Sequence, residues 1–355
     1  MGSNELVASS MAHNRGRPFS IVDKRPVRKT RKLTAPIYTV LIVNPNSRSG
    51  LTGKNWESLE TSIRRVLREN LQVVFSKKQG DGSVLARTFL KRGFRKVIAI
   101  GGDGTINEVA NGFFEEPAGI YGKASGPLKP INPDAVMGIV PCGTRNVLSK
   151  SLGLPETVVK CCRNFASGKP RKIDVVRATV KNPNDHSSVS RIYLNAAEIG
   201  LGAEIAERSR KVRKVLSNRI VSTATGILAT LPSYQSNECE VLLDGHREKI
   251  KMTMAIVANG KFLAGGFKTA SNAEMSDGLL DVVIVKDAGS LKMLGELFSM
   301  KSGEYDKDSN VIYRQSRKAS LKSTERDVTV TVDGETIGIL PATFKVARHA
   351  LNIMM

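Results

Sequence analysis

The sequence predicts an α/β domain built on a doubly wound, Rossmann-like parallel sheet, followed by a C-terminal antiparallel β-sandwich. Three observations predict this division. The 355 residues exceed the ~250–300 at which a single core stops growing, so two domains are expected. Strand and helix patterns alternate up to about residue 170, which is the order of βαβ units. Beyond Gly168, strand patterns follow one another with few helices between them.

The first domain is expected to alternate strands with helices. Apolar runs predict strands over 37–43, 71–75, 97–100 and 136–140. Trp56, Leu59, Ile63 and Leu67 recur at helical spacing on one face, and a second helix is expected over 83–91. The resulting βαβαβ order predicts a parallel sheet, whose ligands bind outside the carboxyl ends of its strands.

The second domain is expected to be mostly β. A basic helical stretch, roughly 203–231, interrupts its strands. Strand patterns cover 175–180, 190–197, 239–243, 249–257, 280–285, 311–321 and 328–332. We therefore divide the chain into a basic arm over 1–35, an α/β domain over 36–170 and a β-sandwich domain over 171–355, whose last residues are candidates to pack back on the first domain.

The arm over 1–35 carries eight Lys and Arg residues against only Glu5 and Asp23, and it lacks a hydrophobic period. This composition predicts a disordered segment. Two interpretations stay open for it. It is either a solvated tail without a function or a segment attracted to anionic lipid, where each basic residue contributes ~1 kcal/mol near the surface.

The formal charge of +21 indicates a polyanionic partner, either nucleic acid or an anionic membrane. No run of 18 apolar residues and no signal-sequence pattern occur, so we expect a cytoplasmic protein whose membrane contact is peripheral. The four cysteines, Cys142, Cys161, Cys162 and Cys239, lack metal-ligand spacing. They are expected to be free thiols in a reducing compartment.

A glycine-rich turn follows the strand at 97–100 and opens a helix, with the sequence Gly101, Gly102, Asp103, Gly104, Thr105. Glycines allow positive φ and close approach of a ligand to the backbone, and N–H groups at a helix N-terminus bind phosphate. Asp103 would repel phosphate unless a cation lies between them. The turn therefore predicts a nucleotide with Mg2+, against the alternative of an ordinary strand-to-helix turn.

Two further turns, 44–50 and 141–146, follow predicted strands and should lie at the same edge of the sheet. The first is no P-loop, because Arg48 stands where a glycine is required and Asn55 replaces Ser or Thr. The glycine-rich turn also fails the dinucleotide fingerprint, since Asn107 occupies the position of the third glycine. Hydride transfer is therefore not supported.

The three turns, together with Gly265-Gly266 and the DGLLD string at 277–281, resemble the catalytic-domain family of diacylglycerol kinases, sphingosine and ceramide kinases and their prokaryotic relatives. The resemblance runs from about Ile37 to the C-terminus. NAD kinases share the glycine-rich turn and are more distant. Further matches are Gly80-Asp81, the 195–204 segment, Ser302-Gly303-Glu304, Asp333-Gly334-Glu335 and Leu340-Pro341-Ala342.

This resemblance implies that the first domain binds ATP and that the sandwich carries part of a lipid cleft. It implies that Asn44, the turn 101–105 and Thr144 line ATP. Asp81 and Asp103 would join the polar network near the phosphates and Mg2+, with Asp103 as the candidate metal ligand. Asp277, in the DGLLD string, matches the proposed base that takes the proton of the lipid hydroxyl.

The implied function is an ATP-dependent lipid kinase that phosphorylates the hydroxyl of a diacylglycerol-like or sphingoid lipid at an anionic membrane surface, in phospholipid metabolism. No specific nucleic-acid partner is expected, and whether the chain forms a homodimer is left open. The chain departs from the family at Val147, where many relatives have Asp. An NAD kinase-like enzyme and a non-catalytic basic protein that binds nucleotide or nucleic acid are the alternatives.

Overall fold

The computed structural model describes residues 39–115, 126–213, 234–263, 268–287 and 310–355, and the single positions 230 and 295. The predicted basic arm lies outside the described residues. So do the glycine pair at 265–266 and the 302–304 motif. No helix in the described part of the chain is both long and apolar enough to cross a membrane.

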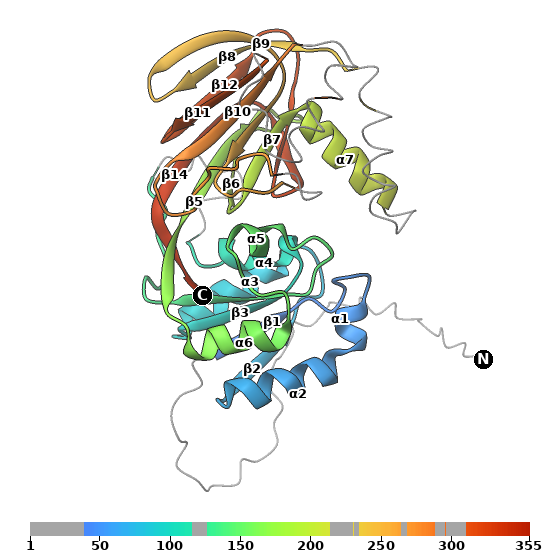
Figure 1. The fold of residues 1–355 in the computed structure, drawn as a ribbon, viewed down its shortest axis with the longest axis vertical. Helices are drawn as coiled ribbons and strands as arrows, with labels where there is room; N and C mark the ends of the chain where they lie inside the picture. Colours follow the sequence, from blue (N-terminus) through green and yellow to red (C-terminus); the bar gives the residue numbers. More distant parts are fainter. Residues whose placement is uncertain are drawn as a thin grey trace, which may run out of the picture. The chain divides into compact units, whose positions relative to one another are not determined.

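A parallel sheet forms the first part of the described chain (Figure 1). Its strands are β1 (Thr39–Val43), β2 (Leu71–Phe75), β3 (Lys96–Gly101) and β4 (Val136–Pro141). The spatial order is β4-β3-β1-β2, and every pair is parallel. After β2 the chain crosses to the other side of β1 and adds β3 and then β4 there, so the strand order reverses between β1 and β3. Open α/β sheets bind ligands at such a topological switch point.

Helices cover both faces of this sheet because the side chains of the buried strands alternate. Leu41 and Ile98 pack against α2 (Trp56–Leu67) and α6 (Val158–Ser167). Their neighbours in the chain, Val40 and Val97, pack against α3 (Asp81–Lys91) and α4 (Asp103–Asn111). Two shorter helices, α1 (Leu51–Lys54) and α5 (Val147–Ser151), follow β1 and β4. The predicted doubly wound domain is confirmed.

The second part of the chain is mainly antiparallel, and the predicted β-sandwich is confirmed. Its inward side chains form one core, which includes Val176, Phe344 and Val257. One helix, α7 (Leu201–Arg213), follows β7. The strands are β5 (Pro170–Lys181), β6 (Ser188–Tyr193), β7 (Ala196–Gly200), β8 (Asn237–Leu243), β9 (His246–Ala258), β10 (Leu280–Lys286), β11 (Val311–Ser316), β12 (Lys318–Ser323), β13 (Thr329–Val332) and β14 (Glu335–Met354).

The longest strand, β14, was not among the predicted elements. It pairs with β5 in antiparallel register along most of its length, and its end pairs with β4 in parallel register at Asn352↔Val136. Figure 1 shows the strand running from the β-rich region to the parallel sheet, where the C-terminus lies. The same strand therefore belongs to both sheets.

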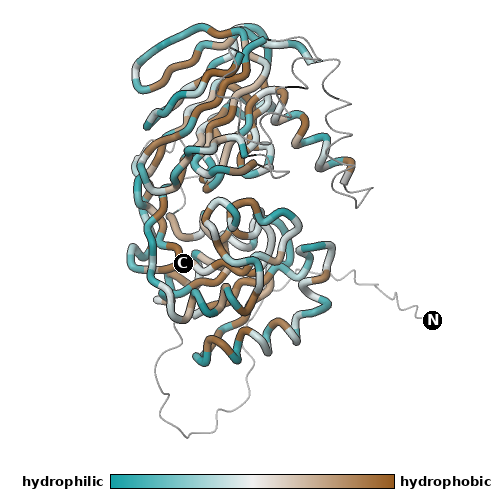
Figure 2. The backbone as a smooth tube through the Cα atoms, viewed as in Figure 1, coloured by the Kyte–Doolittle hydropathy of each residue, from teal (hydrophilic) through white to brown (hydrophobic). Residues whose placement is uncertain are grey.

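Two predicted strands are each divided in the structure. The segment predicted over 190–197 forms β6 and β7, and the segment predicted over 311–321 forms β11 and β12. The predicted helix over 203–231 is α7 up to Arg213, and its remainder falls largely outside the described residues. Figure 2 shows hydrophobic segments along the strands of both sheets and hydrophilic segments on the β8–β9 hairpin.

Candidate active site

The turns after β1 and β3 are joined at the topological switch point. The Asn44 backbone N–H donates to the Ile100 carbonyl at 2.9 Å. The Asn44 Nδ2 donates to Thr105 Oγ1, also at 2.9 Å. Asn44 and Thr105, both predicted to bind ligand, therefore hold the glycine-rich turn in place through their side chains.

The glycines of this turn are also needed for packing within the protein. Gly102 has φ −89°, and neither Gly101 nor Gly104 has a positive φ. The turn therefore does not use the positive φ that glycine allows. The glycines are required by close packing, because a Cβ on Gly143 would lie 2.5 Å from Gly102 Cα and a Cβ on Gly101 would lie 2.7 Å from the Thr105 side chain. The second and third turns thus touch backbone to backbone.

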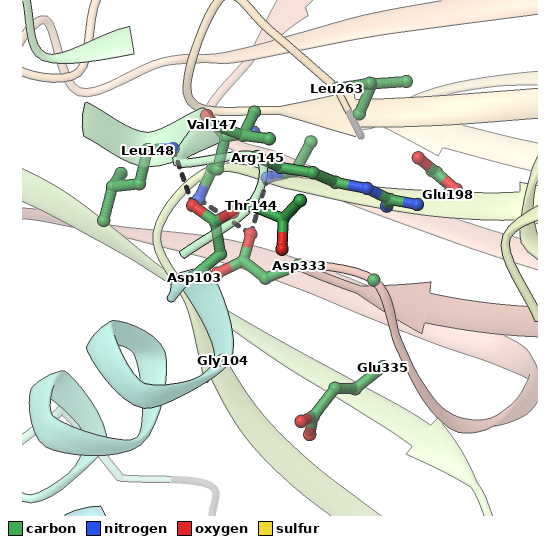
Figure 3. Close-up of a pocket in the computed structure, with 13 residues that line it drawn as sticks. Asp103, Gly104, Thr144, Arg145, Val147, Leu148, Glu198, Leu263, Asp333 and Glu335 are labelled. Carbon is green, nitrogen blue, oxygen red and sulfur yellow. Dashed lines mark hydrogen bonds between the residues drawn. The ribbon is translucent and has the colours of Figure 1, made fainter. Parts of the chain in front are cut away.

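Asp103 belongs to the glycine-rich turn, and its side chain reaches toward the turn after β4. Its Oδ1 accepts a hydrogen bond from the Leu148 N–H at 3.2 Å, so its carboxylate faces the N-terminus of α5 (Figure 3). Burial raises the pKa of Asp103, while the backbone N–H groups of α5 and Arg145 act in the opposite direction. The positive end of a helix and a nearby cation are favourable surroundings for a carboxylate. These groups offset part of the effect of burial on Asp103.

A pocket of about 300 Å³ opens beside Asp103. The glycine-rich turn, the turn after β4 and the start of α5 form one side, and the start of β7, Leu263 after β9 and the β13–β14 turn contribute the other residues. We call it the acidic pocket, because four carboxyl groups line it together with a single cation, Arg145. Its lining residues are Asp103, Gly104, Thr144, Arg145, Val147, Leu148, Asn195, Ala196, Glu198, Leu263, Asp333, Gly334 and Glu335.

Asp333 has a structural role in this pocket, because its oxygens are saturated with donors. Oδ1 accepts from the backbone N–H groups of Asn195 and Ala196, both at 3.0 Å. Oδ2 accepts from the Leu194 N–H at 3.0 Å and from Asn107 Nδ2 at 2.7 Å. These bonds divide the strand predicted over 190–197 into β6 and β7. They also tie α4 to the sandwich.

Glu198 and Arg145 are functional candidates that the sequence did not reveal. The Arg145 guanidinium points toward the Glu198 carboxyl group in Figure 3. The Glu198 residue is only 8% exposed, and burial raises its pKa to about 7, with Arg145 lowering and Asp333 raising it. Val147, in the turn after β4, lines the same pocket as Glu198.

Glu335 is the carboxylate that the sandwich places near the start of α4. Its Oε1 would be 3.7 Å from a Cβ added to Gly104. The same oxygen accepts a hydrogen bond from Gln79 Nε2 at 3.2 Å. Because Glu335 is partly exposed, its carboxylate can meet a molecule that enters the pocket.

Asp81 is not among the residues that line the acidic pocket. Its Oδ2 accepts from the backbone N–H groups of Lys77 and Lys78 at 2.7 and 3.0 Å, and these bonds lower the pKa of Asp81. Glu108 holds the same turn by accepting from the Gly80 and Gly82 N–H groups. The turn thus positions Gln79 against Glu335, while Asp81 acts within the turn itself.

Asp277 also does not line the pocket. Its Oδ1 accepts from the Leu279 N–H at 2.8 Å, within its own turn. The neighbouring Gly278 N–H donates to the buried Asp174, which also accepts from the His349 N–H. The base role of Asp277 stays a prediction, and the pocket geometry favours other carboxylates.

The predicted residues therefore separate into two groups. Asp103, Gly104 and Thr144 line the acidic pocket. Asn44, Gly101, Gly102 and Thr105 lie behind it and fix the turns. No group of three or more His, Cys, Asp or Glu side chains that could hold a metal ion occurs in the part of the chain that the structure describes. This donor set fits Mg2+ only where nucleotide phosphates supply further ligands, which is the usual arrangement for that ion in kinases.

Two families match the chain, one for each part. Residues 38–178 match the diacylglycerol kinase catalytic domain, and residues 195–355 match the YegS C-terminal NAD kinase beta sandwich-like domain. The chain is 26% identical to a diacylglycerol kinase of Bacillus subtilis strain 168 over 277 residues, which cover 78% of this chain and 82% of the relative. It is 27% identical to a diacylglycerol kinase of Staphylococcus carnosus strain TM300, at the same coverage.

The fold agrees with these matches. The crystal structure of a diacylglycerol kinase from Bacillus anthracis strain Sterne superposes with a TM-score of 0.62 at 19% identity, covering 89% of this chain and 96% of that one. The matched catalytic domain and the relatives identify a kinase, an enzyme that transfers phosphate to an alcohol group. The chain is similar to diacylglycerol kinases in both of its parts. The non-catalytic alternative is therefore not supported.

Proposed function

We propose that this protein is an ATP-dependent lipid kinase that transfers the γ-phosphate of ATP to the hydroxyl of a diacylglycerol-like or sphingoid lipid at a membrane surface. The observation that carries the proposal is the acidic pocket. It joins the start of α4, where a helix N-terminus can bind phosphate, to carboxylates of the sandwich that can receive an alcohol. The names of the relatives support the lipid as acceptor.

The charge of the pocket supports a nucleotide bound together with a divalent cation. Four carboxyl groups and one Arg line it, so phosphates alone would be repelled. Asp103 is the residue that would hold Mg2+ on the nucleotide. When bound, such an ion neutralises charge on the transferring phosphoryl group. Thr144 and the backbone at Gly104 would orient the nucleotide beside it.

Glu335 is the carboxylate that we propose as the acceptor of the hydroxyl proton. It faces the start of α4, it is partly exposed, and its position is fixed by Gln79. Asp333 is unsuited to this role because its oxygens already accept four hydrogen bonds. A base must reach the hydroxyl within hydrogen-bond distance, and proton transfer of this kind contributes about 10²–10⁴ in rate.

Radiolabelled γ-phosphate tests the proposal. The protein is incubated with labelled ATP, Mg2+ and either diacylglycerol or sphingosine in detergent micelles, or NAD in solution. We expect label in a lipid phosphomonoester and about 10²-fold less in Glu335→Gln. Asp134→Asn, an exposed carboxylate outside the pocket, is the matched control. Label in NAD alone would replace the proposal with an NAD kinase. Unchanged labelling in Glu335→Gln would reject this base.

A further inference from the structure

A second hollow of about 820 Å³ lies along the β14–β5 ribbon and shares no lining residue with the acidic pocket. We call it the basic groove. Five Lys and Arg side chains and one His line it, and none of its lining residues is acidic. These residues are Lys172, Arg177, Lys318, Lys345, Arg348 and His349.

Three of these cations form a single row across three strands. Lys318 of β12 pairs with Lys345 of β14, which pairs with Arg177 of β5. Their neighbours along the strands, such as Phe344 and Ala178, are buried in the core, so the row lies on the outer face of the sheet. Like charges directly opposite each other destabilise a sheet. An anion bound over Lys318 and Lys345 would relieve this repulsion.

A row of hydroxyl groups lies beside the cations. Thr343 is two residues from Lys345 and shares its face, and it pairs with Ser320 on β12 and with Thr179 on β5. The Ser320 and Thr343 hydroxyl oxygens are 3.0 Å apart, and those of Thr179 and Ser190 are 2.9 Å apart. Cations beside neutral hydroxyl donors are the groups that bind the oxygens of a phosphate.

A register shift in β14 brings Arg348, a fourth cation, to the groove. The pairing of β14 with β5 shifts between Ala347 and Leu351, and His349 adopts φ +52°. Asp174 fixes this bulge by accepting from the His349 N–H at 2.6 Å. Both Arg348 and His349 consequently line the groove.

The remaining lining is partly apolar. The segment 126–133 contributes Pro127, Leu128, Pro130 and Pro133. Arg177 donates to the Gly126 carbonyl in this segment, and burial lowers the pKa of Arg177. The groove thus combines phosphate-binding groups with apolar surface, which matches the head and the upper chain of an anionic amphiphile.

We propose that the basic groove binds the phosphate headgroup of an anionic phospholipid and so attaches the protein to a membrane independently of its catalytic pocket. The source of the phosphate is a lipid in a bilayer, because the apolar lining would be unused by a free phosphate. Attraction of Lys and Arg side chains to an anionic surface, which acts within about a Debye length, strengthens such an attachment.

Vesicle sedimentation of the full-length chain tests this proposal. Vesicles contain phosphatidylcholine with or without phosphatidylglycerol. Lys318→Glu combined with Lys345→Glu should lower partitioning to the anionic vesicles at least about tenfold. The matched control, Lys91→Glu with Lys160→Glu, makes the same charge change on exposed helical positions outside the groove and should bind more tightly than the groove variant.

Lys345→Gln, a milder change, keeps the test valid if the double variant fails to fold, and it should also weaken partitioning relative to Lys91→Gln. Equal partitioning of groove and control variants would overturn the proposal. Calorimetry with inorganic phosphate identifies the source of the ligand. The lipid is rejected in favour of a free-phosphate site under two conditions. The groove variant loses phosphate binding in calorimetry, and it partitions to vesicles as much as the control variant does.

Discussion

The acidic pocket and the basic groove are two hollows of opposite charge in one chain. Four carboxyl groups and one Arg line the pocket, whereas five Lys and Arg residues and no acid line the groove. Both are proposed to receive phosphate. The difference teaches that phosphate can be bound in two ways, through a cation that accompanies the nucleotide or directly through the side chains of the protein.

The same contrast bears on the high charge of the chain. A net charge of +21 indicates an anionic partner. In the acidic pocket, however, Arg145 is the single cation among the lining residues. We therefore attribute recognition of an anionic surface to other parts of the molecule, of which the basic groove is one. The next four predictions separate the two hollows or test what holds the pocket together.

Removal of divalent cations should impair the acidic pocket and leave the basic groove unaffected. A chelator should reduce phosphate transfer by more than about 10³-fold, because the acidic pocket then repels the nucleotide. Partitioning to phosphatidylglycerol vesicles should not fall, because the groove binds phosphate through its own cations. Labelled transfer and sedimentation, measured on one protein preparation with and without EDTA, provide the comparison. Transfer that persists in EDTA would contradict the proposed role of the cation.

Asp103→Asn and Asp277→Asn distinguish the pocket geometry from the sequence-based interpretation. Asp103 lines the pocket and faces the start of α5, so its loss should lower kcat/KM by about 10²–10³. Asp277 accepts a hydrogen bond within its own turn, and its loss should have a smaller effect on kcat/KM. The two variants are compared in steady-state assays, with thermal unfolding as the check on folding. A larger loss for Asp277→Asn would restore its assignment as the base.

Glu198 should make the stability of the protein depend on pH. Its pKa is raised from 4.5 to about 7, so the folded state favours the neutral acid. This contribution is complete below pH 4.5 and is lost as the pH rises through 7, a loss of about 3 kcal/mol. Urea unfolding should show that Glu198→Gln gains stability over the wild type at pH 8 but not at pH 4.5. The exposed Glu57→Gln should show no such difference, and equal behaviour of both variants would reject the buried acid.

Gly143→Ala tests the contact between the two glycine turns. A Cβ at Gly143 would lie 2.5 Å from Gly102 Cα, so the turns must separate, at a cost of about 1–3 kcal/mol. Gly126→Ala is the control, because its Cβ would meet nothing within 4 Å. Differential scanning calorimetry of both variants measures the effect. A neutral Gly143→Ala would show that the close approach of the turns is not required.

The α/β part of the fold was predictable because its signals are local. The strand predicted over 71–75 coincides with β2, and the helix predicted over 83–91 differs from α3 only at its start. The strand β14 was missed because Gly338 and Pro341 interrupt its pattern, and both residues weaken a strand assignment. Its pairing partners in β5 and β4 are far away in the sequence, so no local pattern marks it.

The turns of the candidate site could be predicted from the sequence, but the residues that contact these turns could not. The glycine-rich turn identified Asp103 and Gly104 because motif spacing is visible along the chain. The role of Asp333 depends on N–H groups at 194–196, more than a hundred residues earlier. Arg145 points toward Glu198 only because β7 lies near the turn after β4. Only the three-dimensional structure brings such residues together.

The most direct test of the central claim, that the two hollows act separately, measures both readouts on two variants. Labelled phosphate transfer in detergent micelles and sedimentation with phosphatidylglycerol vesicles are measured for Asp103→Asn and for Lys318→Glu combined with Lys345→Glu. We predict that Asp103→Asn loses transfer and keeps vesicle binding, whereas the groove variant keeps transfer and loses vesicle binding. Loss of both readouts in each well-folded variant would contradict two separate phosphate sites.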